Sequence, residues 1–218
     1  MVELVAQALT ASDPATLRSE LRRGLRRKAR AARAALPPEE RRRAEQAISR
    51  HLIAQLRGTG SLAPRTRIAG YLAVRSEIGI ADFLACAIDA QCSVFLPRVT
   101  APRLGRMTFS PAAATRRCGA FGIPEPDSRE RIDARWLHIV LLPLVGFDDE
   151  GNRLGSGAGF YDRALAFRAW RDHWRGPQLI GVAHSCQRTA ALPTLPTDIP
   201  LDAVVTEKGF FSLSGATR

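Results

Sequence analysis

The sequence contains no long run of apolar residues. Hydrophobic residues make up 45% of the 218-residue chain, but no segment approaches the ~18 consecutive apolar residues that a membrane-spanning helix needs. The first ten residues also lack the basic segment and small-residue cleavage site of a secretory signal peptide. We therefore expect a cytoplasmic protein that does not bind membranes. The apolar fraction is enough for a buried core, and the length suits one large domain or two small ones.

Cysteine and histidine are scarce, and their spacing is not that of metal ligands. The four cysteines contain no C-x-x-C pair and the four histidines no H-x-x-x-H pair, so zinc is not expected. In a chain without an export signal, we expect the cysteines to be reduced thiols in the core. They are Cys86, Cys92, Cys118 and Cys186.

Lysine is almost absent, and the basic charge is concentrated in one segment. All but Lys28 and Lys208 of the 32 basic residues are arginine, and the formal net charge is +11. Residues 18–50 hold twelve basic residues against four glutamates, so this segment carries +8 of that charge. The excess fits either an anion-binding surface or the coding bias of a genome. The segment has no Phe, Tyr or Trp, which disfavours binding of nucleic acid by base stacking.

This basic segment has the pattern of two helices. Asp13 can accept from free N–H groups at a helix start, and Pro14 suits the first helical position. Pro37 and Pro38 break the pattern before a second helix. The expected apolar face of the first helix consists of Leu17, Leu21, Leu25, Ala29, Ala32 and Leu36. Arginines on another face are Arg18, Arg22, Arg26, Arg30 and Arg33, and the second helix has Ile48, Leu52 and Leu56 on its apolar face.

The rest of the chain alternates between short apolar runs and helical stretches. Such alternation predicts β-α-β units and a three-layer α/β domain with a mostly parallel sheet. Strands are expected at residues 68–74, 93–96, 107–109, 138–145, 179–183 and 203–206, and helices at 80–90 and 161–174. We expect residues 14–212 to form a single domain, with basic helices at 14–57, an α/β core at 65–207 and a disordered segment at 1–13.

A glycine-rich segment follows the most apolar predicted strand. Gly155, Gly157 and Gly159 alternate, so backbone N–H groups can approach phosphate oxygens there, and Arg153 can add a charged fork. The alternative is a turn that binds no ligand. Phe160 rules out the dinucleotide fingerprint G-x-G-x-x-G, and no G-K-[ST] of a Walker loop occurs.

Three acidic residues are candidates for the same site. Asp162 is close enough to the loop to hold Mg²⁺ on a bound triphosphate, or it is a first-turn carboxylate that stabilises the helix. Asp198 lies in a loop bounded by prolines. This segment is either only a turn, or Asp198 is a second metal ligand. Glu77 follows the first predicted strand, where it contacts either a substrate ring or solvent.

These segments, in this order, resemble 5-formyltetrahydrofolate cyclo-ligase, also called methenyltetrahydrofolate synthetase, over residues 18–207. The resemblance rests on the basic helix with residues 36–41, Glu77-Ile78, residues 121–126, the glycine-rich loop through Arg163, and residues 198–207. It implies a ligase that forms a C–N bond by cyclising 5-formyltetrahydrofolate with ATP and Mg²⁺. It also implies a fold similar to that of sugar-phosphate isomerases and coenzyme A transferases.

The resemblance also implies the site residues. Arg153 and Asp162 are the catalytic residues, and Asp162 and Asp198 hold Mg²⁺. The ATP-binding residues are Arg22, Arg23, Arg26, Arg153, Leu154, Gly155, Ser156, Gly157, Ala158, Gly159, Phe160 and Tyr161. The folate-binding residues are Leu72, Glu77, Phe121, Ser156, Gly157, Ala158, Gly159 and Phe160.

The sequence departs from the family pattern at a few of these positions. Arg22 stands where the family usually has lysine, so a planar fork replaces a point charge. Phe160 replaces a frequent tyrosine, while Ser156 and Ala158 differ from the commonest residues there. We expect a monomer or a weak homodimer. The alternative function is a non-catalytic relative that binds nucleic acid through the basic helices.

Overall fold

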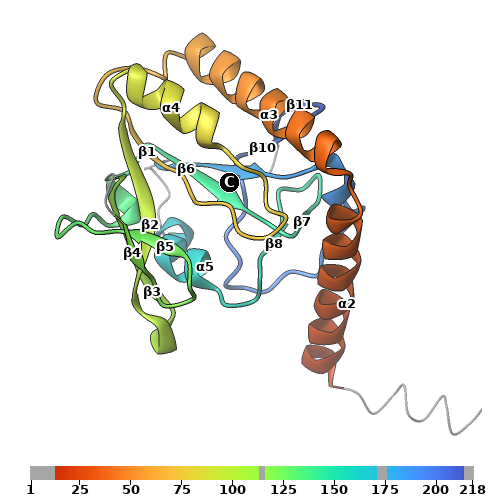
Figure 1. Ribbon diagram of the computed structural model, residues 1–218. Helices are drawn as coiled ribbons and strands as arrows, with labels where there is room; N and C mark the ends of the chain where they lie inside the picture. The colour runs from red at the N-terminus through yellow and green to blue at the C-terminus, as the bar shows by residue number, and fades with distance from the viewer. Residues whose placement is uncertain (1–12, 113–115, 171–175, 214–218) are drawn as a thin grey trace, which may run out of the picture.

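The computed structural model describes residues 13–112, 116–170 and 176–213, which fold around a seven-stranded sheet (Figure 1). The strand order is β11-β10-β9-β6-β1-β2-β3, and the five strands from β10 to β2 pair in parallel. The bounds are β1 Arg67–Ala69, β2 Ser93–Ala101, β3 Arg106–Pro111, β6 Ile139–Pro143, β9 Gln178–Val182, β10 Ala203–Thr206 and β11 Gly209–Ser212. The predicted α/β fold with a mostly parallel sheet is confirmed.

Four helices accompany this sheet, with two small hairpins. The helices are α2 Pro14–Ala34, α3 Pro38–Gly58, α4 Ala81–Asp89 and α5 Phe160–Leu165. The hairpins are β4 Arg116–Cys118 with β5 Pro124–Pro126, and β7 Gly146–Phe147 with β8 Arg153–Leu154. Short 3₁₀ turns lie at Pro102–Leu104, Ala134–Trp136, Ala166–Trp170 and Ser185–Gln187. No helix in the described part of the chain is long and apolar enough to span a membrane.

The central strand β6 shows how the sheet separates two apolar layers. Ile139 and Leu141 face the layer formed with α3 and α4, whereas Val140 and Leu142 face the opposite layer. All four side chains are buried, because successive residues of a strand point to opposite faces and both faces are covered. The second layer includes Leu165 of α5, so α5 packs across the sheet from α3 and α4.

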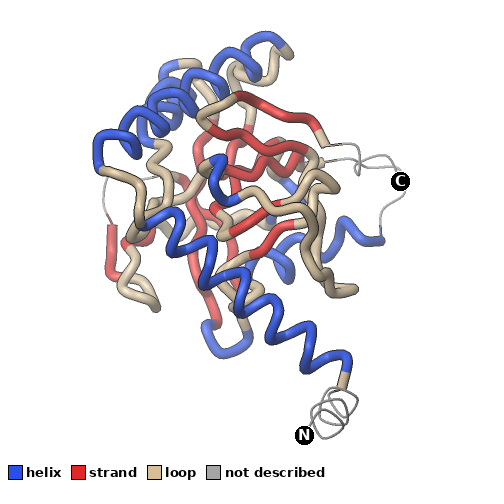
Figure 2. The backbone as a smooth tube through the Cα atoms, turned by 90° about the vertical axis from the view of Figure 1, so that its right-hand side faces the viewer, coloured by secondary structure: helices blue, strands red, loops and turns tan. Residues whose placement is uncertain are grey.

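Helix α2 lies at one end of the sheet beside β7 and the Ser185–Gln187 turn (Figures 1 and 2). The predicted apolar face of α2 is buried only in part: Leu17 and Leu21 are 37% and 61% exposed and Leu25 is half-buried, while Arg22 and Arg33 are buried. The physical reason is that α2 packs against loops that present carbonyl and carboxylate oxygens. Asp13 stands at the helix start but its side chain makes no capping bond.

Two strand predictions were wrong at their ends. Strand β2 does not end before Pro97 but continues to Ala101. Beyond Phe95 it pairs only with β3, so Pro97 lies in a part of the strand with one neighbour. The missing N–H of a proline is tolerated there, as it is in an edge strand. Strand β1 stops at Ala69, and the chain continues as a loop in which Tyr71 is buried and Ala73 is exposed.

Other expectations had mixed outcomes. The last predicted strand, 203–206, matches β10 at both ends, and the helix at 80–90 matches α4 within one residue. The predicted helix at 161–174 is α5 followed by a 3₁₀ turn, and residues 171–174 lie outside the described residues, as do residues 1–12. The cysteines are free thiols, but only Cys92 is buried, so the expectation of four core thiols is wrong.

The contrast between α2 and α3 can be tested with matched leucine substitutions. Leu52 of α3 is fully buried in the core, whereas Leu21 of α2 is 61% exposed. We expect Leu52→Ala to lower the free energy of unfolding by about 2–5 kcal/mol, and Leu21→Ala to change it by less than about 0.5 kcal/mol. Urea denaturation followed by circular dichroism measures both free energies of unfolding. Equal losses of stability would show that Leu21 packs in the core.

Candidate functional site

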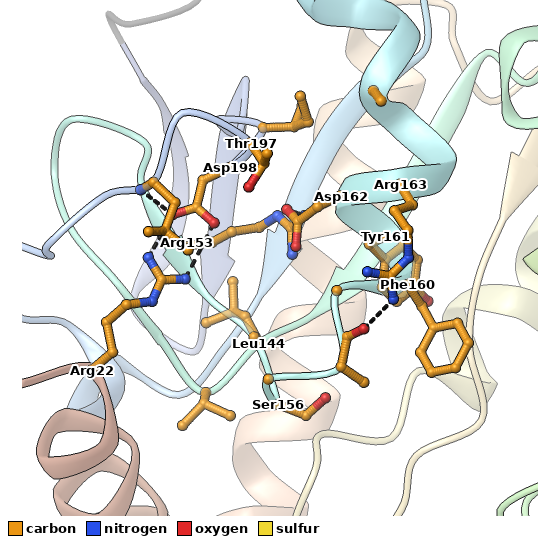
Figure 3. A pocket seen from close by; sticks show the side chains of 18 of the residues that line it. Arg22, Leu144, Arg153, Ser156, Phe160, Tyr161, Asp162, Arg163, Thr197 and Asp198 are labelled. Atoms are coloured by element: carbon orange, nitrogen blue, oxygen red, sulfur yellow. Dashed lines mark hydrogen bonds and ion pairs between the residues drawn. The ribbon is translucent and has the colours of Figure 1, made fainter. Parts of the chain in front are cut away.

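A cavity of about 550 Å³ opens beyond the carboxyl end of β6 (Figure 3). The open end of a parallel sheet is where α/β proteins bind ligands. The cavity is lined by the residues that follow β6, by the glycine-rich loop and α5, by the loop before β10, and by one face of α2. Segments that are distant in the sequence therefore meet at one site.

Most of the predicted site residues line this cavity. They are Arg22, Arg26, Glu77, Arg153, Gly155, Ser156, Gly157, Ala158, Gly159, Phe160, Tyr161, Asp162 and Asp198. Four others do not line it: Arg23 is exposed on α2, Leu72 is half-buried, Leu154 is buried in the core, and Phe121 lies outside. The ring of Phe121 still packs edge-on against Phe160, with 5.6 Å between ring centroids.

Arginine side chains hold the carbonyl groups of the glycine-rich loop, residues 155–159. Arg26 Nε donates to the Gly155 carbonyl at 2.9 Å and Arg30 to the Ser156 carbonyl at 3.3 Å. Arg163 donates to the Ala158 carbonyl. No described residue accepts from the backbone N–H groups of residues 155–159. The loop therefore keeps its donors available for an anionic ligand, while arginines occupy three of its carbonyl groups.

Two of the loop glycines are required by the backbone. Gly157 has a φ of +112° and Gly159 a φ of +67°, a region that residues with a Cβ rarely adopt. These two positions explain the alternation of glycine in the sequence. They turn the chain from β8 into α5 within a few residues.

Two arginine–aspartate ion pairs stand inside the cavity (Figure 3). Arg22 binds Asp198 through both nitrogens, at 2.5 and 3.2 Å, and also donates to the Pro193 carbonyl. Arg153 binds Asp162 at 2.5 Å, and its side chain is only 3% exposed. The Nε of Arg153 is buried and has no partner among the described residues.

Glu77 reaches the cavity from the loop after β1. It accepts from the Val74 N–H at 3.1 Å, and burial raises the pKa of its carboxyl group. Burial, with the charge of Glu77 second, also raises the pKa of the Tyr161 hydroxyl. A carboxyl group in this position can pair with polar atoms of a ligand ring.

The sequence analysis missed Arg30, Arg33 and Arg163 as site residues. Arg33 Nε donates to the Ser76 hydroxyl at 3.0 Å, next to Glu77, and burial lowers the pKa of its guanidinium. The signal was present for two of them, because Arg30 and Arg33 continue the helical face of Arg22 and Arg26. We call these four side chains the arginine face of α2.

The two cavity aspartates fit a divalent cation that also binds phosphate. Asp162 lies in the first turn of α5, and Asp198 is held in its loop by the Leu195 N–H at 2.9 Å. No group of three His, Cys, Asp or Glu side chains that could hold a metal occurs among the described residues. Mg²⁺ commonly takes one or two carboxylates and fills its other positions with water and phosphate oxygens, so two carboxylates are enough.

The chain is similar to proteins of one family along most of its length. A family model described as the 5-formyltetrahydrofolate cyclo-ligase family matches residues 18–207. The 5-formyltetrahydrofolate cyclo-ligase of Haemophilus influenzae is 30% identical over 192 residues, 85% of this chain and 97% of that protein. The enzyme of Escherichia coli K12 is 45% identical over 83 residues, so the match spans less than half of it (43%) and 38% of this chain.

The fold is similar as well. The structure of 5,10-methenyltetrahydrofolate synthetase from Aquifex aeolicus superposes with a TM-score of 0.71 at 31% identity, covering 89% of this chain and 93% of that one. The sequence resemblance over residues 18–207 is therefore confirmed. The chain belongs to the 5-formyltetrahydrofolate cyclo-ligase family, a family of ligases.

Proposed function

We propose that this protein cyclises 5-formyltetrahydrofolate to 5,10-methenyltetrahydrofolate, using ATP and Mg²⁺ and releasing ADP and phosphate. The observation that carries the proposal is the glycine-rich loop, where arginines hold three carbonyl groups and no described residue accepts from the backbone N–H groups. An array of free N–H groups beside guanidinium groups is suited to the oxygens of a triphosphate.

Arg22, Arg26 and Arg153 are proposed to contact the phosphates. All three line the cavity. Burial and the neighbouring charges of Arg22 and Arg30 lower the pKa of Arg26. An incoming polyanion would relieve this crowding of positive charge, which favours binding of ATP at the end of α2.

Asp162 and Asp198 are proposed to hold Mg²⁺. When bound, the cation would offset negative charge on the transferred group. Each aspartate is paired with an arginine. The arginines can exchange these carboxylates for phosphate oxygens, so that each charged side chain keeps a partner of opposite sign.

The reaction needs a poor leaving group to be converted into a good one. The formyl oxygen on N5 attacks the γ-phosphorus, and the bond to the bridging oxygen breaks, which releases ADP. N10 then attacks the phosphorylated formyl carbon and loses its proton, and the C–O bond breaks to release phosphate. The protein contributes positioning and electrostatic stabilisation, the main sources of catalysis in phosphoryl transfer.

The folate is proposed to lie on the side of the cavity that Glu77 and Phe160 form. Glu77 supplies a carboxyl group, and the edge-on pair of Phe160 and Phe121 supplies an aromatic surface. Binding of nucleic acid has no observation in its favour, because the arginine face of α2 is bonded to loops of the same chain.

Removing the carboxylate of Asp162 tests the proposed metal site. We expect Asp162→Asn to lower kcat by about a hundredfold or more without loss of the fold, because the side chain is a ligand and not a core group. Asp149→Asn is the matched control, since Asp149 also pairs with an arginine at 2.5 Å but on the exposed surface. Steady-state kinetics at saturating Mg²⁺ compares the two, and a near-normal kcat for Asp162→Asn would refute the assignment.

Removing Arg22 should affect the two ligands in opposite directions. Arg22→Gln frees Asp198 and removes a phosphate contact, so we expect tighter Mn²⁺ binding without nucleotide and ATP binding weaker by about tenfold. Electron paramagnetic resonance of free Mn²⁺ and calorimetric titration with ATP measure these affinities. Weaker binding of both would show that Arg22 holds Asp198 in place for the metal and does not compete with it.

A further inference from the structure

Arg163 connects the glycine-rich loop to a part of the sheet that is not in the cavity. Its Nε donates at 3.1 Å to the carbonyl of Gly105, at the turn between β2 and β3, and its Nη2 donates to the carbonyl of Ala158. Its guanidinium carbon also lies 5.9 Å from the centre of the Phe160 ring. One side chain therefore contacts three segments, and Figure 3 shows its bond to the loop.

The guanidinium occupies space that two glycines leave empty. Gly105 is buried and has a φ of +60°, and a Cβ there would lie 1.7 Å from Nη2 and 2.2 Å from Cζ of Arg163. A Cβ at Gly159 would lie 3.0 Å from Nη1. Real Cβ atoms do not approach this closely at position 105, so any side chain there would displace the arginine.

The loop is thus held from two sides by different elements. The arginine face of α2 bonds the carbonyls of Gly155 and Ser156, at the end of the loop next to the proposed phosphate contacts. Arg163 bonds Ala158 and packs on Phe160, at the end next to the proposed folate side. The two ends can therefore be perturbed separately.

We propose that Arg163 is a positioning residue for the folate side of the cavity. Gly105 keeps it in place, because the absence of a side chain there leaves room for the guanidinium group. This inference rests on the proposed function. Arg163 acts through Ala158 and Phe160, so its loss displaces the folate-binding surface and leaves the phosphate contacts of α2 in place.

Variants at positions 105 and 163, with one control, test this arrangement, which we call the clamp. Arg163→Ala removes the guanidinium, Gly105→Ala displaces it, and the double variant combines them. Gly60→Ala is the matched control, because Gly60 has a similar φ of +67° but no atom lies within 4 Å of its Cβ position. The control therefore carries the backbone cost of a left-handed alanine without touching an arginine.

We expect Arg163→Ala and Gly105→Ala each to raise the KM for 5-formyltetrahydrofolate by about tenfold, as for one charge-assisted hydrogen bond, with the KM for ATP changed less than about twofold. The double variant should be no worse than Arg163→Ala, because the alanine at 105 acts only by displacing the guanidinium. Gly60→Ala should leave both KM values unchanged. Arg163→Lys keeps the charge but not the fork, and should still raise the folate KM.

Additive effects in the double variant, or equal changes in both KM values, would overturn the proposal. Urea denaturation of the same variants separates this outcome from a failure of the proposed function. If the unaltered protein forms no methenyl product, the proposed function fails. The clamp is then tested only by the free energies of unfolding of the two single variants and the double variant. A coupling between positions 105 and 163 then supports the clamp, and independent losses of stability refute it.

Discussion

Four arginines on one face of α2 reach oxygen atoms on three loops of the α/β core. Arg22 binds Asp198, Arg26 and Arg30 bind the glycine-rich loop, and Arg33 binds Ser76. Leu17 and Leu21 of α2 are exposed, so that part of the helix is joined to the core by these contacts and not by buried leucines. The cavity wall and the conformation of the loop therefore depend on charge-assisted hydrogen bonds at the site, not on apolar packing.

This arrangement gives the basic segment a specific role. Guanidinium groups that hold the loop carbonyls leave the loop N–H groups free. Guanidinium groups paired with aspartates have their charge neutralised until an anion and a cation bind together. Part of the positive charge of residues 18–50 is thus bonded to groups of the same chain. A helix whose arginines were free at the surface would have favoured nucleic acid.

The sequence predicted the parts of this structure that depend on local pattern. Alternating strands and helices predicted the parallel sheet, and the spacing of Arg22 and Arg26 placed both on one helical face. Two leucines of the predicted apolar face of α2 are exposed, because periodicity identifies a face but not what the face packs against. The contact of Arg163 with Gly105 joins residues 58 positions apart, and neither residue type indicates the other.

The central claim is that the arginine face of α2 and the glycine-rich loop form an ATP site for cyclisation of folate. The most direct measurement is the absorbance of the methenyl product when pure protein is mixed with 5-formyltetrahydrofolate, ATP and Mg²⁺, each omitted in turn and then restored. The account predicts product only when all three are present. Product without ATP, or no product from folded protein with all three, would contradict it.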